Sequence, residues 1–339
     1  MSSARGRAVK CPQTAAWSDP LKRPVMLLRL QAAVSVIILV LLLMTVDLPG
    51  TLARLGSLEP VHGLVALGLY FLVHLSNAAK LRVLLPQRSL WQLLGFTLLA
   101  QAYALMLPGQ LAGDAVKAFR LGRAPGTGFS RAASSVTFDK VTGLASVLVM
   151  LLAGLTALPL GKGVGLMLAA LIGISALAAV AAMMGSRRLL RPLIAYVLKD
   201  PTTGWRARLG RHLIDFLRHW QDLVKRPGLV FLSLAWGLVA QFLSVAGTLM
   251  LARGLGIELG FLAWCVVLGA LTIILLAPVA LAGLGLREAS LIGLLDMFGV
   301  GSEAALALGL ALLGVQIIFG GIGLSCDLLV LARDRRAPR

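Results

Sequence analysis

Long apolar stretches dominate the hydrophobic pattern of this chain, and alternating apolar and polar positions do not. Six runs reach the roughly 20 residues that a helix needs to cross a bilayer. Short alternating segments, typical of membrane β-barrels, are absent from the sequence. The pattern predicts an all-α polytopic membrane protein with about six full transmembrane spans: Pro24–Val46, His62–Leu85, Val136–Leu158, Gly163–Met184, Gly228–Ala252 and Ala304–Ala332.

Two further apolar runs are interrupted by helix-breaking residues. Leu90–Leu107 stops at Pro108 and Gly109, and Leu259–Ala277 stops at Pro278. Proline removes a backbone donor and glycine weakens a helix. Broken backbone at membrane depth is tolerated only where protein or a watery cavity satisfies it. We therefore predict two re-entrant helical hairpins, each of which enters the membrane, breaks and returns to the same side.

Basic residues predict the orientation of these segments, because loops kept in the cytoplasm carry an excess of Lys and Arg. The tails 1–23 and 333–339 and the segment 187–226 are strongly basic, which predicts that all three are cytoplasmic. The basic segment Lys117–Arg131 is also cytoplasmic if the first hairpin opens inward and the second, 259–298, opens to the opposite side. Eight plain spans are the alternative, with Lys117–Arg131 in an outer loop.

The two interruptions resemble each other. Pro108-Gly-Gln-Leu-Ala-Gly113 and Pro278-Val-Ala-Leu-Ala-Gly283 share Pro and Leu-Ala-Gly at equal offsets. Lys117 and Arg287 then lie at the same distance from the two prolines. Paired Gly/Pro-interrupted segments in corresponding halves are typical of transporter binding sites. The match predicts an internal, inverted, transporter-like repeat.

A single transmembrane domain, 24–332, contains both halves in this interpretation. The first repeat covers about 62–184 and the second about 228–332. The segment 187–226 between them is an amphipathic cytoplasmic linker, and its 205–226 stretch is expected to lie in the headgroup plane and brace the repeats.

Composition supports the membrane assignment. Hydrophobic residues make up 58% of the 339 residues and charged residues only 14%, with a mean hydropathy of +0.90; ordinary globular chains carry about 25% charged residues. The net charge of +18 is concentrated in the tails and the linker, which favours anionic lipid over nucleic acid as partner. Three cysteines without paired spacing indicate no disulfide framework or metal site, and no cofactor is expected.

Basic residues after each interruption are the candidate ligands. A short helix begins there, and its free N–H groups and positive end attract an anion. We predict that Lys117, Arg120 and Arg287 bind the phosphate of a lipid headgroup. The residues assigned to the helix breaks are Pro108, Gly109, Gly113, Pro278, Gly283 and Gly285.

Three carboxylates near the hairpins are predicted to gate or orient the site. Asp139 is expected to meet Lys117 or Arg120 and hold the first hairpin, although an ordinary interfacial charge pair explains it equally well. Asp114 is assigned to the same region. Glu288 is expected to orient Arg287 or act as a gate.

His74 and Asn77 give one span a polar face. They line a headgroup path in one interpretation and form interhelical hydrogen bonds in the other.

Three stretches carry a family resemblance. "LPGQLAGDAVKAFRLGR", "SVTFDKVTGL" (135–144) and "APVALAGLGLREASLIGLL" (277–295) resemble segments of the lysylphosphatidylglycerol synthase transmembrane-region family, also called the flippase-like domain family. Ala112 departs from the usual glycine, and Lys117 and Lys140 stand where arginine is commoner. Lysine keeps the charge but loses the bidentate fork of arginine.

The resemblance implies a multi-pass protein of a bacterial-type cytoplasmic (inner) membrane, with both termini in the cytoplasm. It covers the membrane part alone, and we expect no aminoacyltransferase domain. It implies a flippase-like transporter for an anionic phospholipid or a lipid-linked polyprenyl-phosphate or glycolipid substrate. We expect membrane lipids as partners, together with a lipid-modifying enzyme or a second copy of the chain.

Two alternatives to a transporter stay open. One is an integral membrane lipid transferase, for which Asp114, Asp139 and Glu288 are the candidate catalytic groups. No Asp-x-x-Asp cluster accompanies them, and we expect the protein not to be an enzyme. The other is a non-transporting scaffold for a lipid-modifying enzyme.

Overall fold

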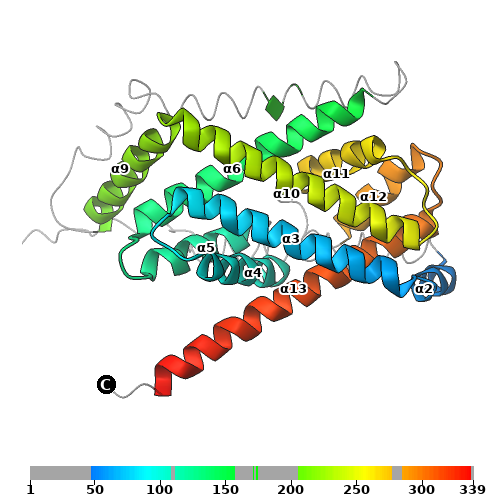
Figure 1. The fold of residues 1–339 in the computed structure, drawn as a ribbon, viewed down its shortest axis with the longest axis horizontal. Coiled ribbons are helices and arrows are strands. Elements are labelled where there is room, and N and C mark those ends of the chain that lie inside the picture. The colour runs from blue at the N-terminus through cyan, green and yellow to red at the C-terminus, as the bar shows by residue number, and fades with distance from the viewer. Residues whose placement is uncertain are drawn as a thin grey trace, which may run out of the picture.

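A computed structural model of the protein describes residues 47–107, 111–156, 171, 173–174, 205–276 and 285–336. Throughout these residues the regular secondary structure is helical, which confirms the all-α class (Figure 1). The helices are α2 (Leu48–Gly56), α3 (Pro60–Leu84), α4 (Leu90–Met106), α5 (Leu111–Arg123), α6 (Phe129–Leu155), α9 (Trp205–Val224), α10 (Pro227–Gly254), α11 (Phe261–Leu276), α12 (Leu286–Asp296) and α13 (Ser302–Arg336).

Four of these helices, α3, α6, α10 and α13, are long and apolar enough to cross a membrane, by length and composition. They correspond to four of the six predicted spans. The other two, Pro24–Val46 and Gly163–Met184, lie outside the described residues. The protein is therefore a multi-pass helical membrane protein, and the total of six spans stays a prediction.

The interrupted apolar runs form helices that are too short to span. α4 has 17 residues and α11 has 16, so at 1.5 Å per residue each is about 25 Å long, against a hydrocarbon core of about 30 Å. α4 begins in a capping box, in which the N–H of Gln92 donates to Ser89 Oγ and the N–H of Ser89 donates to Gln92 Oε1. This cap fixes where the chain leaves α3 and enters the first short helix.

Each short apolar helix packs against the shorter helix that follows it, α4 against α5 and α11 against α12. The α4–α5 pair joins the end of α3 to the start of α6, and the α11–α12 pair joins the end of α10 to the start of α13. The two pairs lie toward opposite ends of the bundle (Figure 1). We call the α4–α5 pair the first hairpin and the α11–α12 pair the second hairpin; that they are re-entrant from opposite sides of a membrane stays a prediction.

The eight helices from α3 to α6 and from α10 to α13 form two four-helix units. Long and short helices follow in the same order in both units, and equivalent helices of the two units make equivalent contacts. In both α3–α6 and α10–α13, two short helices stand between two long ones. The first helices pack together, α3 on α10, and α4 packs on α13 as α11 packs on α6. α3 and α10 run antiparallel, because Tyr70 Oη lies 2.7 Å from Thr248 Oγ1 while Gly254 lies beside His62. The boundaries of the sequence repeat stay a prediction.

Glycines shape both hairpins. Gly113 lies in the first turn of α5, where a Cβ atom would collide with the carbonyl oxygen of Ala100, so that only glycine lets α5 approach α4 this closely. Gly285 precedes α12 with a φ of 78°, a conformation that glycine adopts without strain. Four residues assigned to the breaks, Pro108, Gly109, Pro278 and Gly283, lie outside the described residues.

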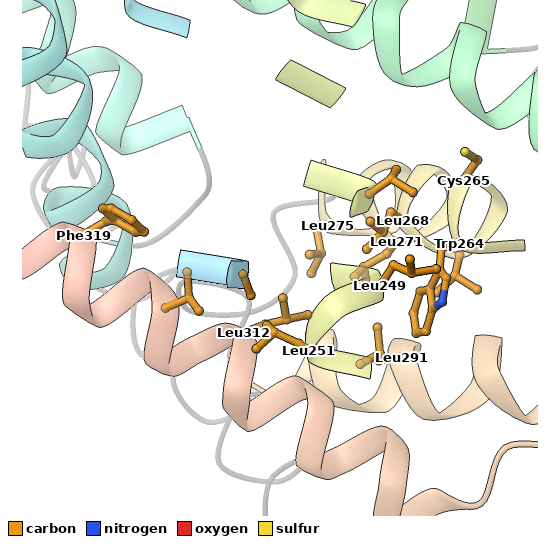
Figure 2. Close-up of a cluster of buried hydrophobic side chains, with 14 of the residues drawn as sticks. Leu249, Leu251, Trp264, Cys265, Leu268, Leu271, Leu275, Leu291, Leu312 and Phe319 are labelled. Carbon is orange, nitrogen blue, oxygen red and sulfur yellow. The ribbon is translucent and has the colours of Figure 1, made fainter. Parts of the chain in front are cut away.

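The second hairpin is held by an apolar core. Leu249 of α10, Trp264 and Leu271 of α11, Leu291 of α12 and Leu312 of α13 are buried in one cluster (Figure 2). Trp264 and Leu291 have no exposed surface. Lipid tails are as apolar as these side chains, so van der Waals packing between the helices, and not transfer out of water, holds the cluster together. This core fixes α12, and with it the position of Arg287.

The amphipathic linker forms helix α9, which packs on α6 as a brace. Trp220 is fully buried, and its ring meets that of Phe138 edge-on at a centroid distance of 5.4 Å. The apolar face thus covers protein, and polar residues such as Arg218 stay exposed.

A histidine lies at the seam between α9 and α6. His219 Nε2 is 3.4 Å from Ser135 Oγ. Burial lowers the pKa of His219, and the positive charges of Arg131 and Arg226 lower it further, against an opposing contribution from Asp222. The folded protein therefore favours the neutral imidazole here.

Candidate headgroup site between the two hairpins

Two adjoining cavities, of about 350 and 300 Å³, lie where the hairpins meet. Side chains from all eight helices of the two four-helix units line the larger one, which we call the first cavity. Gly113 and Lys117 reach it from α5, and Thr272 and Arg287 reach it from α11 and α12. Helices of both hairpins therefore line one space.

Five charged side chains form a continuous network on one wall of the first cavity. Lys80 Nζ lies 3.2 Å from Asp139 Oδ1 and donates to the carbonyl oxygen of the same residue at 2.6 Å. Lys117 Nζ lies 3.3 Å from both Asp139 Oδ2 and Asp114 Oδ1. Lys140 Nζ lies 3.2 Å from Asp114 Oδ2. We call these five residues the charge network.

The charge network ties the first hairpin to its neighbours, because its members come from α3, α5 and α6. The expected contact between Asp139 and Lys117 is present. Lys80 and Lys117 have side chains only 2% and 7% exposed, and buried charges of this kind are stable only when paired. The sequence analysis gave Lys80 no role in the site. A lysine within an apolar span was the signal that could have identified it.

Lys117 and Arg120, both predicted phosphate ligands, are occupied by carboxylates. Lys117 lines the first cavity but is shared between Asp114 and Asp139. Arg120 Nη2 donates to Asp327 Oδ2 at 2.6 Å, which joins α5 to α13. Arg120 is absent from the described lining of either cavity. The three predicted ligands are therefore not gathered around one point.

Arg287, the third predicted ligand, lines both cavities. It is 7% exposed, and its buried Nη1 has no hydrogen-bond partner in the described part of the chain. A guanidinium removed from water with an unused donor is costly unless an anion pairs with it. This side chain is the strongest candidate for binding a phosphate.

Glu288 is buried beside Arg287 but bonds elsewhere. Its Oε2 accepts the N–H of Gly285 at 2.7 Å and so caps α12. This bond also occupies one of the backbone donors that the sequence offered to an anion. The orienting or gating roles of Glu288 and Asp114 stay predictions.

Neutral polar groups complete the site. His74 and Asn77 of α3 line both cavities, and that these cavities form a headgroup path stays a prediction. Gln101, Gln241 and Gln316, from α4, α10 and α13, do the same and were missed by sequence reasoning. The signal was a carboxamide flanked by apolar residues, the only one in α10 and in α13 and the second of two in α4. Within the described residues, no three His, Cys, Asp or Glu side chains gather as metal ligands.

Comparison with known families gives one match. The family described as "Lysylphosphatidylglycerol synthase TM region" matches residues 29–323, which is most of the chain. The protein belongs to this family. No curated protein and no solved structure matches it.

The stretches that carried the resemblance to the lysylphosphatidylglycerol synthase TM-region family surround the first cavity. The first contributes α5 with Lys117, the second contributes Asp139 on α6, and the third contributes Arg287 on α12. Segments far apart in the sequence are thus brought to one site by the two hairpins.

Proposed function

We propose that the protein is a flippase-like transporter that moves an anionic, phosphate-bearing lipid between the leaflets of a bacterial-type inner membrane. The phosphate binds Arg287 between the hairpins. One observation carries the proposal: a buried guanidinium with an unused donor faces a cavity that is lined by helices of both hairpins. Broken helices that meet at mid-membrane are the usual place for a transporter's substrate.

The charge of the first cavity favours an anion. Its lining holds four Lys or Arg side chains against two Asp side chains, a surplus of two positive charges with histidine uncounted. Both carboxylates are already paired with lysines of the charge network. A phosphate that enters therefore meets attraction without a competing free carboxylate.

In the proposed mechanism the two hairpins are re-entrant from opposite sides, and both termini are cytoplasmic. The headgroup enters laterally and pairs with Arg287, and the acyl or prenyl chains stay in the surrounding lipid. Rocking of one four-helix unit against the other then presents the headgroup to the second leaflet. The charge network and the Arg120–Asp327 pair hold the first hairpin on the predicted cytoplasmic side.

The transferase alternative is less well supported. It needs a carboxylate that is free to attack or to bind a metal. Asp114 and Asp139 are paired with lysines, and Glu288 caps its own helix. The scaffold alternative predicts that Arg287 is dispensable, and the following experiment tests that directly.

The test is lipid translocation in proteoliposomes that contain the purified protein and a trace of acyl-labelled fluorescent phosphatidylglycerol. External dithionite quenches the label only in the outer leaflet, so the loss of protected signal reports movement. We expect Arg287→Gln to slow translocation at least tenfold, because a charged hydrogen-bonded pair contributes roughly 1.5–3 kcal/mol. Arg253→Gln, at an exposed arginine of α10, is the matched control. Equal rates for wild type and Arg287→Gln would reject the site.

A second test addresses the hairpin topology. A single cysteine at Ala124, in a background without native cysteines, is expected to react with a membrane-impermeant maleimide only from the cytoplasmic side. In the eight-span alternative the same position reacts from outside.

A further inference from the structure

The junction of the two cavities has a distinctive chemistry. Four carboxamides, Asn77, Gln101, Gln241 and Gln316, line both cavities together with Arg287. We call these four the carboxamide cluster. Each comes from a different helix, α3, α4, α10 and α13, so the cluster exists only in the folded protein. Every member is half-buried.

The carboxamide cluster has unused hydrogen-bonding capacity. Its side chains make no hydrogen bond to any other residue that the structure describes. Partly buried polar groups without partners are unfavourable, and interhelical hydrogen bonding, the ordinary reason for amides in membrane helices, does not account for these four. Their donors and acceptors therefore face the cavities.

A carboxamide both donates and accepts, as a hydroxyl group does. A cluster of carboxamides beside one guanidinium thus matches a phosphodiester whose far side carries several hydroxyl groups. An ammonium group only donates, so it can use the oxygen of each carboxamide but leaves the NH₂ donors without a partner, and it also lacks a free carboxylate to pair with its charge. The two carboxylates of the first cavity, Asp114 and Asp139, are both paired with lysines, and the second cavity has none in the described lining.

An amine-bearing headgroup is disfavoured for a second reason. Its positive charge would enter a cavity whose lining has a surplus of two positive charges, of which the phosphate of the lipid offsets only one. Repulsion between like charges is strong in a site of low dielectric constant, and it lowers the affinity for a ligand that carries the same charge.

We infer that the site selects a polyol or sugar phosphodiester headgroup, in which the phosphate pairs with Arg287 and the hydroxyl groups bond to the carboxamide cluster, and that it rejects headgroups ending in an amine. This inference rests on the proposed function for its setting, but it concerns binding and is tested without transport.

The experiment is native mass spectrometry of the purified protein, delipidated and offered equal amounts of three lipids with identical acyl chains. Phosphatidylglycerol carries hydroxyls, phosphatidylethanolamine carries an amine, and phosphatidic acid carries neither. We expect wild type to retain phosphatidylglycerol at least tenfold over the other two, because a site built to hydrogen-bond hydroxyls discriminates strongly against ligands that lack them. Equal retention of phosphatidylglycerol and phosphatidic acid would overturn the role of the cluster.

Two variants of Gln241 and one control variant separate loss of headgroup recognition from loss of fold. Gln241→Leu is expected to retain phosphatidylglycerol and phosphatidic acid about equally. Gln87→Leu, at an exposed glutamine, is the control and is expected to leave the preference for phosphatidylglycerol unchanged. Gln241→Glu adds a carboxylate and is expected to increase retention of phosphatidylethanolamine, a gain that misfolding cannot produce. No gain for Gln241→Glu together with an unaltered preference for Gln241→Leu would reject the inference.

The two proposals fail in different ways. Selective retention without translocation in proteoliposomes would reject transport and leave the headgroup inference standing. Translocation of all three lipids at one rate, without selective retention, would reject the inference and leave the transporter standing.

Discussion

Asp139 pairs with two lysines of the charge network. Its replacement by asparagine tests whether these ion pairs hold the first hairpin in place. Its carboxylate pairs with Lys80 at 3.2 Å and with Lys117 at 3.3 Å. In Asp139→Asn, Lys117 keeps its second partner, Asp114. Lys80 keeps neutral acceptors at residue 139, the backbone carbonyl oxygen and the new amide oxygen, but its buried ammonium group is left without an opposite charge.

The magnitude follows from this count of partners. Breaking a buried ion pair by removing one side costs about 3–5 kcal/mol. One lysine loses its only opposite charge and the other loses one of two, so we expect the free energy of unfolding to fall by about 3–5 kcal/mol, or roughly a factor of 10²–10⁴ in the folded-to-unfolded ratio. Lys80→Met added to Asp139→Asn removes the orphaned charge and is expected to recover a large part of the loss.

The assay is equilibrium unfolding in mixed detergent micelles by titration with SDS, followed by circular dichroism. Asp296→Asn, at an exposed aspartate of α12, is the control and is expected to stay within about 0.5 kcal/mol of wild type. A loss below about 1 kcal/mol for Asp139→Asn, or no recovery in the double variant, would refute the reasoning that the network holds the hairpin.

Three further predictions concern two packed residues and the pH dependence of stability. Gly113→Val is expected to cost at least about 2 kcal/mol, because its side chain meets the carbonyl of Ala100, whereas Gly95→Ala, with open space, is neutral or stabilising in the same unfolding assay. Trp220→Ala is expected to lose about 3–5 kcal/mol and to expose α9 to protease, and unaltered proteolysis would contradict the docking. Lowering the pH through about 6.5 is expected to destabilise the protein, because the lowered pKa of His219 lets the unfolded state take up the proton first. His219→Gln should reduce this pH dependence of the melting temperature; an equal dependence in both proteins would exclude His219 as its source.

The sequence by itself determined the elements. α3, α6, α10 and α13 correspond to predicted spans. Their length and hydrophobicity over some 20 residues are local properties of the sequence, and these properties decide whether a helix can cross a membrane. The ends of α4 and α11 followed from Pro108 and Pro278, since a missing N–H interrupts a helix whatever surrounds it. The family also followed from three short stretches.

Only the tertiary structure decided the partners of the charged residues. Lys117 and Arg120 are three residues apart on one short helix, yet one joins Asp139 and the other joins Asp327, 207 residues away. Which carboxylate a cation meets depends on how helices rotate and cross, and no local window records that. The sequence therefore offered three equivalent phosphate ligands, and packing left Arg287 as the one with a free donor in the described part of the chain.

The carboxamide cluster shows the same limit most clearly. Gln101, Gln241 and Gln316 are each flanked by apolar residues in their helices, and an amide in such surroundings carries no information about its neighbours in the fold. The reciprocal packing of the two four-helix units brings them to one cavity. Local chemistry thus determined where the chain is helical and where it breaks, whereas long-range packing decided which polar groups meet, because a side chain's partner is set by the relative placement of whole helices.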